Sequence, residues 1–326
     1  MITRSELRND GDWFVCTLPF PTLLLAPTLT DFHHAHPPHS AHTVATFIKT
    51  FFAQLWVSFY KNALVLKGRK LSVAFTVLLP SLVVLVLYII IVSILAANTS
   101  YPRFGVENGV MRYGGGALIA AGAVGQSALL LNTVALEKRT HLLQSLRLLS
   151  MWESVHWITW FVTVAFISLV GVVLSIFLAV YAFDLKVYSF VDGGILLLTH
   201  SSLTLATIAA SSIAAAMVQT PVTIGLVIFL SLAGTVGFAF LGNVLPVMLG
   251  GLASEKWYWW GFAPLPVYHF AGIFSDMTFH VYNYDSVTGE PSPHFYGWKE
   301  MSSADELTQA GFGGGLKQYV NMFLFS

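Results

Sequence analysis

The chain contains charge-free apolar runs that are long enough to cross a lipid bilayer. No acidic or basic residue lies between Lys70 and Arg103, and residues 71–97 are rich in Leu, Val and Ile. About 20 apolar residues, each rising about 1.5 Å in a helix, cover the hydrocarbon core. Only 10% of all residues are charged, whereas about a quarter are charged in a soluble domain. We therefore predict an all-α, multi-pass membrane protein.

The same criterion predicts five complete spans, at about residues 71–97, 117–136, 155–181, 194–217 and 222–240. The last two share one charge-free stretch, which Gln219-Thr220-Pro221 divides because proline favours a helix boundary. Residues 241–253 are apolar but too short and too rich in Gly to cross, so a re-entrant or interfacial segment is expected there. An incomplete sixth span is expected from about residue 316, together with a natural transcript that continues beyond Ser326.

The segment before the first span has two parts of different composition. Residues 1–45 are predicted to be a disordered polar leader; their His-rich tract offers imidazoles to Zn or Cu, but we favour a solvated tract and assign no metal site. Residues 46–65 mix aromatic and apolar residues with basic ones. This composition predicts a helix lying in the membrane interface, with Lys49, Trp56 and Lys61 as its characteristic residues. A helical extension of the first span is the alternative.

Basic residues are concentrated before the first span and between spans two and three. Because loops rich in Lys and Arg stay in the cytoplasm, we predict that both segments are cytoplasmic. Residues 98–116 and 275–309 are then expected on the opposite side. The net charge of zero gives no indication of a nucleic-acid partner.

Three blocks of sequence follow one another in a characteristic order. They are Gln54-Leu55-Trp56 with Tyr60-Lys61-Asn62 and the basic residues 67–70; residues 137–150 with Trp157; and Pro264-Leu265-Pro266, Gly272-Ile273-Phe274 and Gly297-Trp298. In order and spacing, these blocks resemble the transmembrane domain of ABC transporter subfamily A. The resemblance covers roughly residue 46 to the C-terminus.

The resemblance implies an exporter-type transmembrane domain that moves lipids or other amphipathic substrates. It also implies that the loop between spans two and three is a coupling helix that docks on a nucleotide-binding domain. The coupling residues would be Glu137, Lys138, Arg139, His141, Gln144, Arg147 and Glu153. The leucine spacing in this loop predicts a helix, with exposed charges at Glu137, Lys138, Arg139 and Arg147. A short amphipathic connector on the lipid headgroups is the alternative.

Two features depart from the family pattern. Residues 98–116 are too few for the large outer domain that members usually carry between the first two spans. The sequence also contains no Gly-Lys-Ser or Gly-Lys-Thr, which a phosphate-binding P-loop requires. We therefore expect no enzyme activity, catalytic residue or bound cofactor in this chain. ATP and Mg²⁺ would be held by a nucleotide-binding domain that, like a second transmembrane domain, is supplied in cis or in trans.

Two other functions compete with an exporter permease. A secondary transporter would need ion- or proton-binding groups within the membrane, and His200 is the only strong candidate in a predicted span. A membrane fragment or scaffold without transport activity is the third possibility. Membrane lipids are expected partners in all three cases.

Overall fold

A computed structural model describes residues 42–97, 102–140, 142–148, 151–217, 223, 225–235, 237, 266–282 and 295–298. The chain divides into two units, Met1–Lys49 and Thr50–Ser326. In the first unit, the described residues are the opening turns of helix α1. The packing described below belongs to the second unit.

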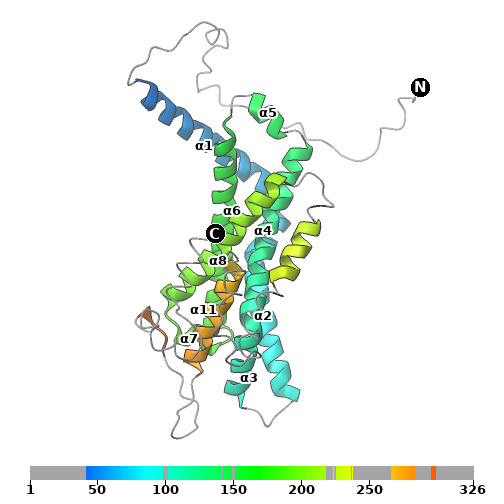
Figure 1. Ribbon diagram of the computed structural model, residues 1–326, viewed down its shortest axis with the longest axis vertical. Helices are drawn as coiled ribbons and strands as arrows, with labels where there is room; N and C mark the ends of the chain where they lie inside the picture. The colour runs from blue at the N-terminus through cyan, green and yellow to red at the C-terminus, as the bar shows by residue number, and fades with distance from the viewer. Residues whose placement is uncertain are drawn as a thin grey trace, which may run out of the picture. The chain divides into compact units, whose positions relative to one another are not determined.

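Nearly all of the described residues are helical (Figure 1). The helices are α1 His42–Gly68, α2 Lys70–Ala97, α3 Arg103–Val110, α4 Gly116–Arg139, α5 Leu142–Leu148, α6 Glu153–Tyr181, α7 Lys186–Phe190, α8 Gly193–Met217 and α11 Pro266–Val281. A π-helical turn, Met111–Gly115, joins α3 to α4, and a short apolar helix covers Gly225–Thr235. The only strand pairing in the described part of the chain is an isolated parallel bridge between Val191 and Tyr296.

Four of these helices, α2, α4, α6 and α8, are long and apolar enough to cross a membrane. They coincide with the first four predicted spans to within three residues at each end, so those spans are confirmed as long apolar helices. Composition is sufficient for this prediction, because a single apolar segment in lipid pairs its backbone N–H and C=O groups within itself by forming a helix.

The later part of the chain agrees with the sequence predictions less closely. The helix Gly225–Thr235 lies inside the predicted fifth span but is shorter than it. Outside the described residues lie almost all of the remainder of that span, the re-entrant segment 241–253, the sixth span and residues 1–41 of the predicted leader. The last four residues of the predicted disordered leader, 42–45, are helical instead and begin α1. Helix α11 was not predicted, and its buried Phe274 and Met277 belong to the largest core cluster. Residues 103–116, expected to form an outer loop, are helical and continue into α4.

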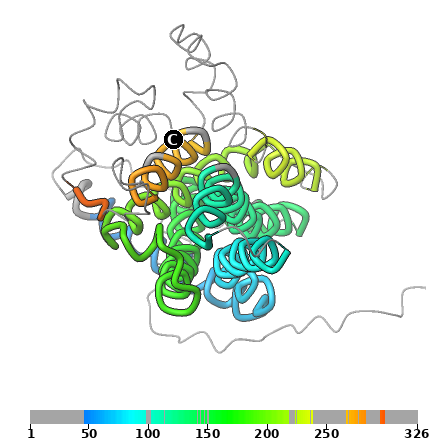
Figure 2. Tube along the Cα trace, turned by 90° about the horizontal axis from the view of Figure 1, so that it is seen from below, coloured from blue at the N-terminus to red at the C-terminus, as the bar shows by residue number. Residues whose placement is uncertain are grey.

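Helix α4 occupies the middle of the bundle and contacts α2, α6, α8 and α11 (Figure 2). The first half of its buried surface is made mainly of Gly and Ala, which allow neighbouring helices to approach closely. Helices α2 and α6 instead expose long apolar side chains at helical spacing: Leu71, Phe75, Leu78, Leu82, Val162, Phe166, Val170, Val173 and Phe177. Such a surface is suited to contact with lipid chains.

A single amide side chain joins three of the membrane-length helices. Pro80 in α2 has no N–H, so the carbonyl group of Thr76, four residues earlier, has no helical donor. The fully buried Gln126 of α4 fills this role, because its Nε2 donates to Thr76 O at 3.0 Å and to Ser168 O of α6 at 3.1 Å. Gln126 therefore holds α2 and α6 against α4.

Gly171 of α6 lies at the point where α6 crosses α2. A Cβ atom at this position would lie 2.6 Å from Val77 O and 2.9 Å from Gln126 Nε2. Both distances are well inside van der Waals contact, and Val77 O belongs to the backbone, which cannot move aside cheaply. Glycine is therefore required for the close approach of these two helices.

We predict that Gly171→Ala lowers the thermal stability of the purified chain in detergent. Overpacking of this kind costs about 1–3 kcal/mol. The matched control is Gly109→Ala in α3, where a Cβ atom meets nothing within 4 Å; replacing a helical glycine there should stabilise by about 0.5–1 kcal/mol. Equal melting temperatures for the two variants would contradict the crossing described above.

Candidate functional site

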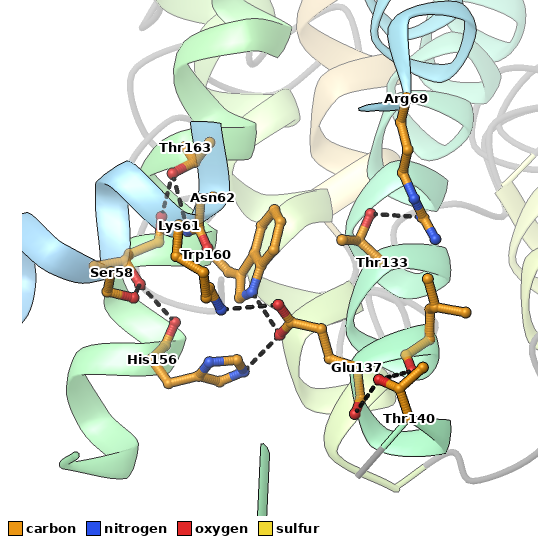
Figure 3. A network of polar contacts seen from close by, with 12 residues as sticks. Ser58, Lys61, Asn62, Arg69, Thr133, Glu137, Thr140, His156, Trp160 and Thr163 are labelled. Atoms are coloured by element: carbon orange, nitrogen blue, oxygen red, sulfur yellow. Dashed lines mark hydrogen bonds and ion pairs between the residues drawn. The ribbon is translucent and has the colours of Figure 1, made fainter. Parts of the chain in front are cut away.

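The most unusual charged group at the α5 end of the bundle is the carboxylate of Glu137, in the last turns of α4. It is only 3% exposed, and three residues of two other helices point toward it (Figure 3). Lys61 Nζ of α1 lies 2.8 Å from Oε1, while Trp160 Nε1 of α6 donates to Oε2 at 2.9 Å. His156 Nε2 of α6 lies 3.5 Å from Oε2. We call Glu137, Lys61, His156 and Trp160 the Glu137 junction.

The charges in the Glu137 junction compensate one another. Lys61 retains 19% side-chain exposure, and its ammonium group also lies 5.3 Å from the centre of the Trp160 ring, in cation–π geometry. A buried carboxylate is tolerated only when it is paired and hydrogen-bonded. Removing one partner of such a pair leaves a charge that is neither solvated nor neutralised. The junction therefore fixes the relative positions of α1, α4 and α6.

Helix α1 carries a row of polar residues toward α6, spaced four residues apart. Three hydrogen bonds follow this row: Trp152 N–H to Gln54 Oε1 at 3.2 Å, Ser58 with Thr159 at 2.7 Å, and Asn62 Nδ2 to Thr163 Oγ1 at 3.3 Å. The other face of α1 is apolar and exposed, with Trp56 at 74% exposure. Such a helix has its polar face against protein and its apolar face available to lipid. Because α1 ends at Gly68 and α2 begins at Lys70, the two are separate helices joined by a turn at Arg69.

The next residue of α4, Lys138, connects α4 to a further helix. Its Nζ donates to Ala215 O at 2.5 Å and to Ala216 O at 2.8 Å, at the C-terminal end of α8. The last carbonyl groups of a helix lack partners within the helix and carry its negative partial charge, so an ammonium group stabilises them. The end of α4 is thus bonded to α1, α6 and α8, directly before α5 begins.

The predicted coupling residues separate into two groups. Glu137 and Lys138 are bound within the bundle, whereas Arg139, Gln144 of α5 and Glu153 of α6 are exposed. Of the residues predicted for the interfacial helix, Lys49 and Trp56 are exposed and Lys61 belongs to the Glu137 junction. His141 lies outside the described residues, and only the backbone of Arg147 is described. The helical character predicted for the loop is present in α5.

The expectation that Glu137 is an exposed charge is wrong. Its partner Lys61 lies 76 residues away in the sequence, on a helix whose packing the local pattern around Glu137 does not reveal. A signal was present in α1, where Gln54, Ser58 and Asn62 repeat every four residues and indicate a face that contacts protein.

A second buried carboxylate, Glu107, lies on α3 and was not singled out from the sequence. Glu107 is 0% exposed, accepts a hydrogen bond from the backbone N–H of Lys186 at 2.6 Å and another from the Tyr282 hydroxyl, and lies 3.8 Å from Arg103 Nε. Burial and the neighbouring Glu107 carboxylate raise the pKa of Tyr282, which keeps the phenol neutral as a donor. Glu107 thereby ties α3 to α7 and to the end of α11.

The two carboxylates lie near opposite ends of the helical segment formed by α3, the π-helical turn and α4. Thirty residues separate Glu107 from Glu137, which corresponds to about 45 Å at 1.5 Å per helical residue. A bilayer with its headgroup regions is about 40–45 Å thick. Each carboxylate is therefore placed where a membrane-spanning α4 would reach one of the two interfaces.

No protein-family model, curated protein or solved structure matches this chain. Within the described residues, no group of three or more His, Cys, Asp or Glu side chains is arranged to hold a metal ion. The function is therefore inferred from the chain's own residues and their geometry.

We predict that Glu137→Gln destabilises the chain in a thermal melt, because it leaves the Lys61 ammonium group without its counter-charge. Breaking a fully buried pair costs about 3–5 kcal/mol, and a smaller loss is expected here because Lys61 is partly exposed. The control is Glu153→Gln at an exposed position of the same end of the bundle.

The double variant Lys61→Met/Glu137→Gln should cost less than the sum of the two single variants, because it removes both charges together. Additive losses would show that the two groups do not depend on each other.

Proposed function

We propose that this chain is the membrane-spanning permease part of an ATP-driven ABC exporter and that it moves lipids or other amphipathic substrates. The observation that carries this proposal is the Glu137 junction. It bonds α4 to α1 and α6 immediately before α5, the helix for which the resemblance implies docking on a nucleotide-binding domain. A force applied to α5 would therefore reach three helices through short, charge-assisted contacts.

The proposed mechanism begins with closure of the nucleotide-binding domain around ATP and Mg²⁺. Closure would displace α5, and with it the adjoining end of α4. Because Glu137 and Lys138 hold α1, α6 and α8, these helices would move with α4 as one body. The exposed side chains of Arg139 and Gln144 would contact the partner, while the second transmembrane domain would complete the transport path.

The lipid part of the proposal is supported by the surfaces that the bundle offers. A groove of about 250 Å³ lies between α4, α8, the helix Gly225–Thr235 and α11. Its walls combine Ala and Val side chains with the hydroxyl groups of Ser127, Thr207 and Ser211. Apolar walls with a few polar groups suit a molecule that has an alkyl chain and a polar part.

A photo-crosslinking amino acid at Leu148, which is 87% exposed on α5, tests the docking partner. In native membranes we expect crosslinked peptides of a P-loop ATPase domain, from this or another polypeptide. The same group at Phe166, on the lipid-facing surface of α6, is the control and should yield no ATPase peptides. Absence of ATPase peptides at Leu148 would contradict the docking role.

Transport is then tested in phosphatidylcholine vesicles that contain the chain and the captured ATPase. We expect ATP-dependent movement of a nitrobenzoxadiazole-labelled phosphatidylcholine between leaflets, read out by dithionite quenching. Transport that follows an ion gradient without ATP would favour a secondary transporter. Absence of movement under both conditions would favour a membrane fragment without transport activity.

In the same vesicles, Arg139→Glu should reduce ATP-dependent transport severalfold while the melting temperature stays unchanged. Arg139 is exposed, and exposed substitutions usually change stability by no more than about 0.5 kcal/mol. Asp184→Asn, which removes an exposed charge on the loop before α7 and tolerates the left-handed backbone there (φ 47°), serves as the control. Full transport by Arg139→Glu would remove this residue from the docking surface.

A further inference from the structure

A small cavity of about 20 Å³ lies in the middle of the bundle, between α2, α4, α6, α7 and α8. It is bounded on one side by Pro80 and Val84 of α2. The polar residues around it are Gln126, Ser175, Tyr188, His200 and Thr204. None of the proposed coupling residues lies near it in the sequence, and the following inference does not depend on the proposed function.

The amide group of Gln126 is fixed in one orientation. Its Nε2 lies 3.0 and 3.1 Å from two carbonyl oxygens, so this atom must be the donor nitrogen and not the acceptor oxygen. The other terminal atom, Oε1, is buried and has no hydrogen-bond partner within the described part of the chain. A buried acceptor without a donor costs about 1–3 kcal/mol.

Three neighbouring polar groups already donate their protons in other hydrogen bonds. His200 Nδ1 lies 2.9 Å from Leu196 O, which makes it the protonated ring nitrogen, so Nε2 accepts from the Tyr188 hydroxyl at 3.1 Å. Likewise, the Ser175 hydroxyl donates to Val172 O at 2.8 Å. The oxygens of Tyr188 and Ser175 can therefore only accept further hydrogen bonds. The cavity thus contains three acceptors and, in the Thr204 hydroxyl, one available donor.

We propose that this cavity binds a single water molecule. The water donates one hydrogen bond to Gln126 Oε1 and the other to the oxygen of Tyr188 or Ser175, and it accepts from the Thr204 hydroxyl. A buried water requires about 10–15 Å³ and two to four polar partners, and the cavity meets both conditions. A cation is disfavoured because no carboxylate lines the cavity, and an organic ligand is excluded by its size.

The bound water has a structural consequence. It completes the hydrogen bonds of the amide group that replaces the missing helical donor at Pro80. It also connects this amide to the Thr204 hydroxyl and to the oxygen of Tyr188 or Ser175. The helices α2, α4, α6 and α8 would then share one continuous network of hydrogen bonds inside the bundle.

The direct test is an experimental structure of the full chain in a lipid nanodisc, at a resolution that shows ordered water. We expect a density peak within hydrogen-bonding distance of Gln126 Oε1 and of at least one oxygen among Tyr188, Ser175 and Thr204. A cavity without density at this position, in a map that shows ordered water elsewhere in the protein, would overturn the proposal.

A filling variant gives a second, independent test. Val172→Ile adds one methyl group at the cavity wall. If water is bound, filling expels it, leaves Oε1 without a donor and lowers the melting temperature; if the cavity is dry, filling leaves the melting temperature unchanged or raises it. In the Gln126→Met background, which lacks the Oε1 acceptor, the loss caused by Val172→Ile should become smaller. Should Gln126→Met not fold, Val84→Ile in the wild-type chain repeats the measurement from another wall, and a raised melting temperature in both filling variants would reject bound water.

Discussion

The carboxylate of Glu137 imposes the constraint on which the α5 end of the bundle depends. A charge that is removed from water must find its partners within the protein, and here they come from helices distant in sequence. Lys61 provides the counter-charge, while Trp160 provides a hydrogen bond. Together with the hydrogen bonds from Gln54, Ser58 and Asn62, this pairing fixes α1 alongside α6 and leaves its apolar face exposed.

The same principle applies at the opposite end of the segment formed by α3 and α4. There Glu107 of α3 accepts hydrogen bonds from α7 and from the end of α11. Between the two ends the packing depends on small residues and on one amide. Gly171 brings α6 onto α2, and Gln126 satisfies the carbonyl group that Pro80 leaves without a donor. The bundle thus combines a closely packed apolar middle with charge-paired ends, which is the distribution that a bilayer demands.

The sequence predicts those features that depend on composition and fails where they depend on contacts between distant segments. The first four spans follow from charge-free runs, and α5 follows from its leucine spacing. The burial of Glu137 could not be predicted from the residues around it, because its partner Lys61 is 76 residues away in the sequence. Similarly, Glu107 meets Tyr282 across 175 residues, and the polar residues His269, Ser275 and Thr278 of α11 are buried against protein.

The central claim is that the Glu137 junction transmits the position of α5 to α1. Pulsed electron paramagnetic resonance tests it most directly, with spin labels at Leu148→Cys on α5 and Tyr60→Cys on α1, both exposed, in a Cys16→Ser chain. We expect a narrow distance distribution that broadens or shifts when Glu137→Gln is added and stays unchanged with Glu153→Gln. An identical distribution in the presence and absence of the Glu137 carboxylate would contradict the account.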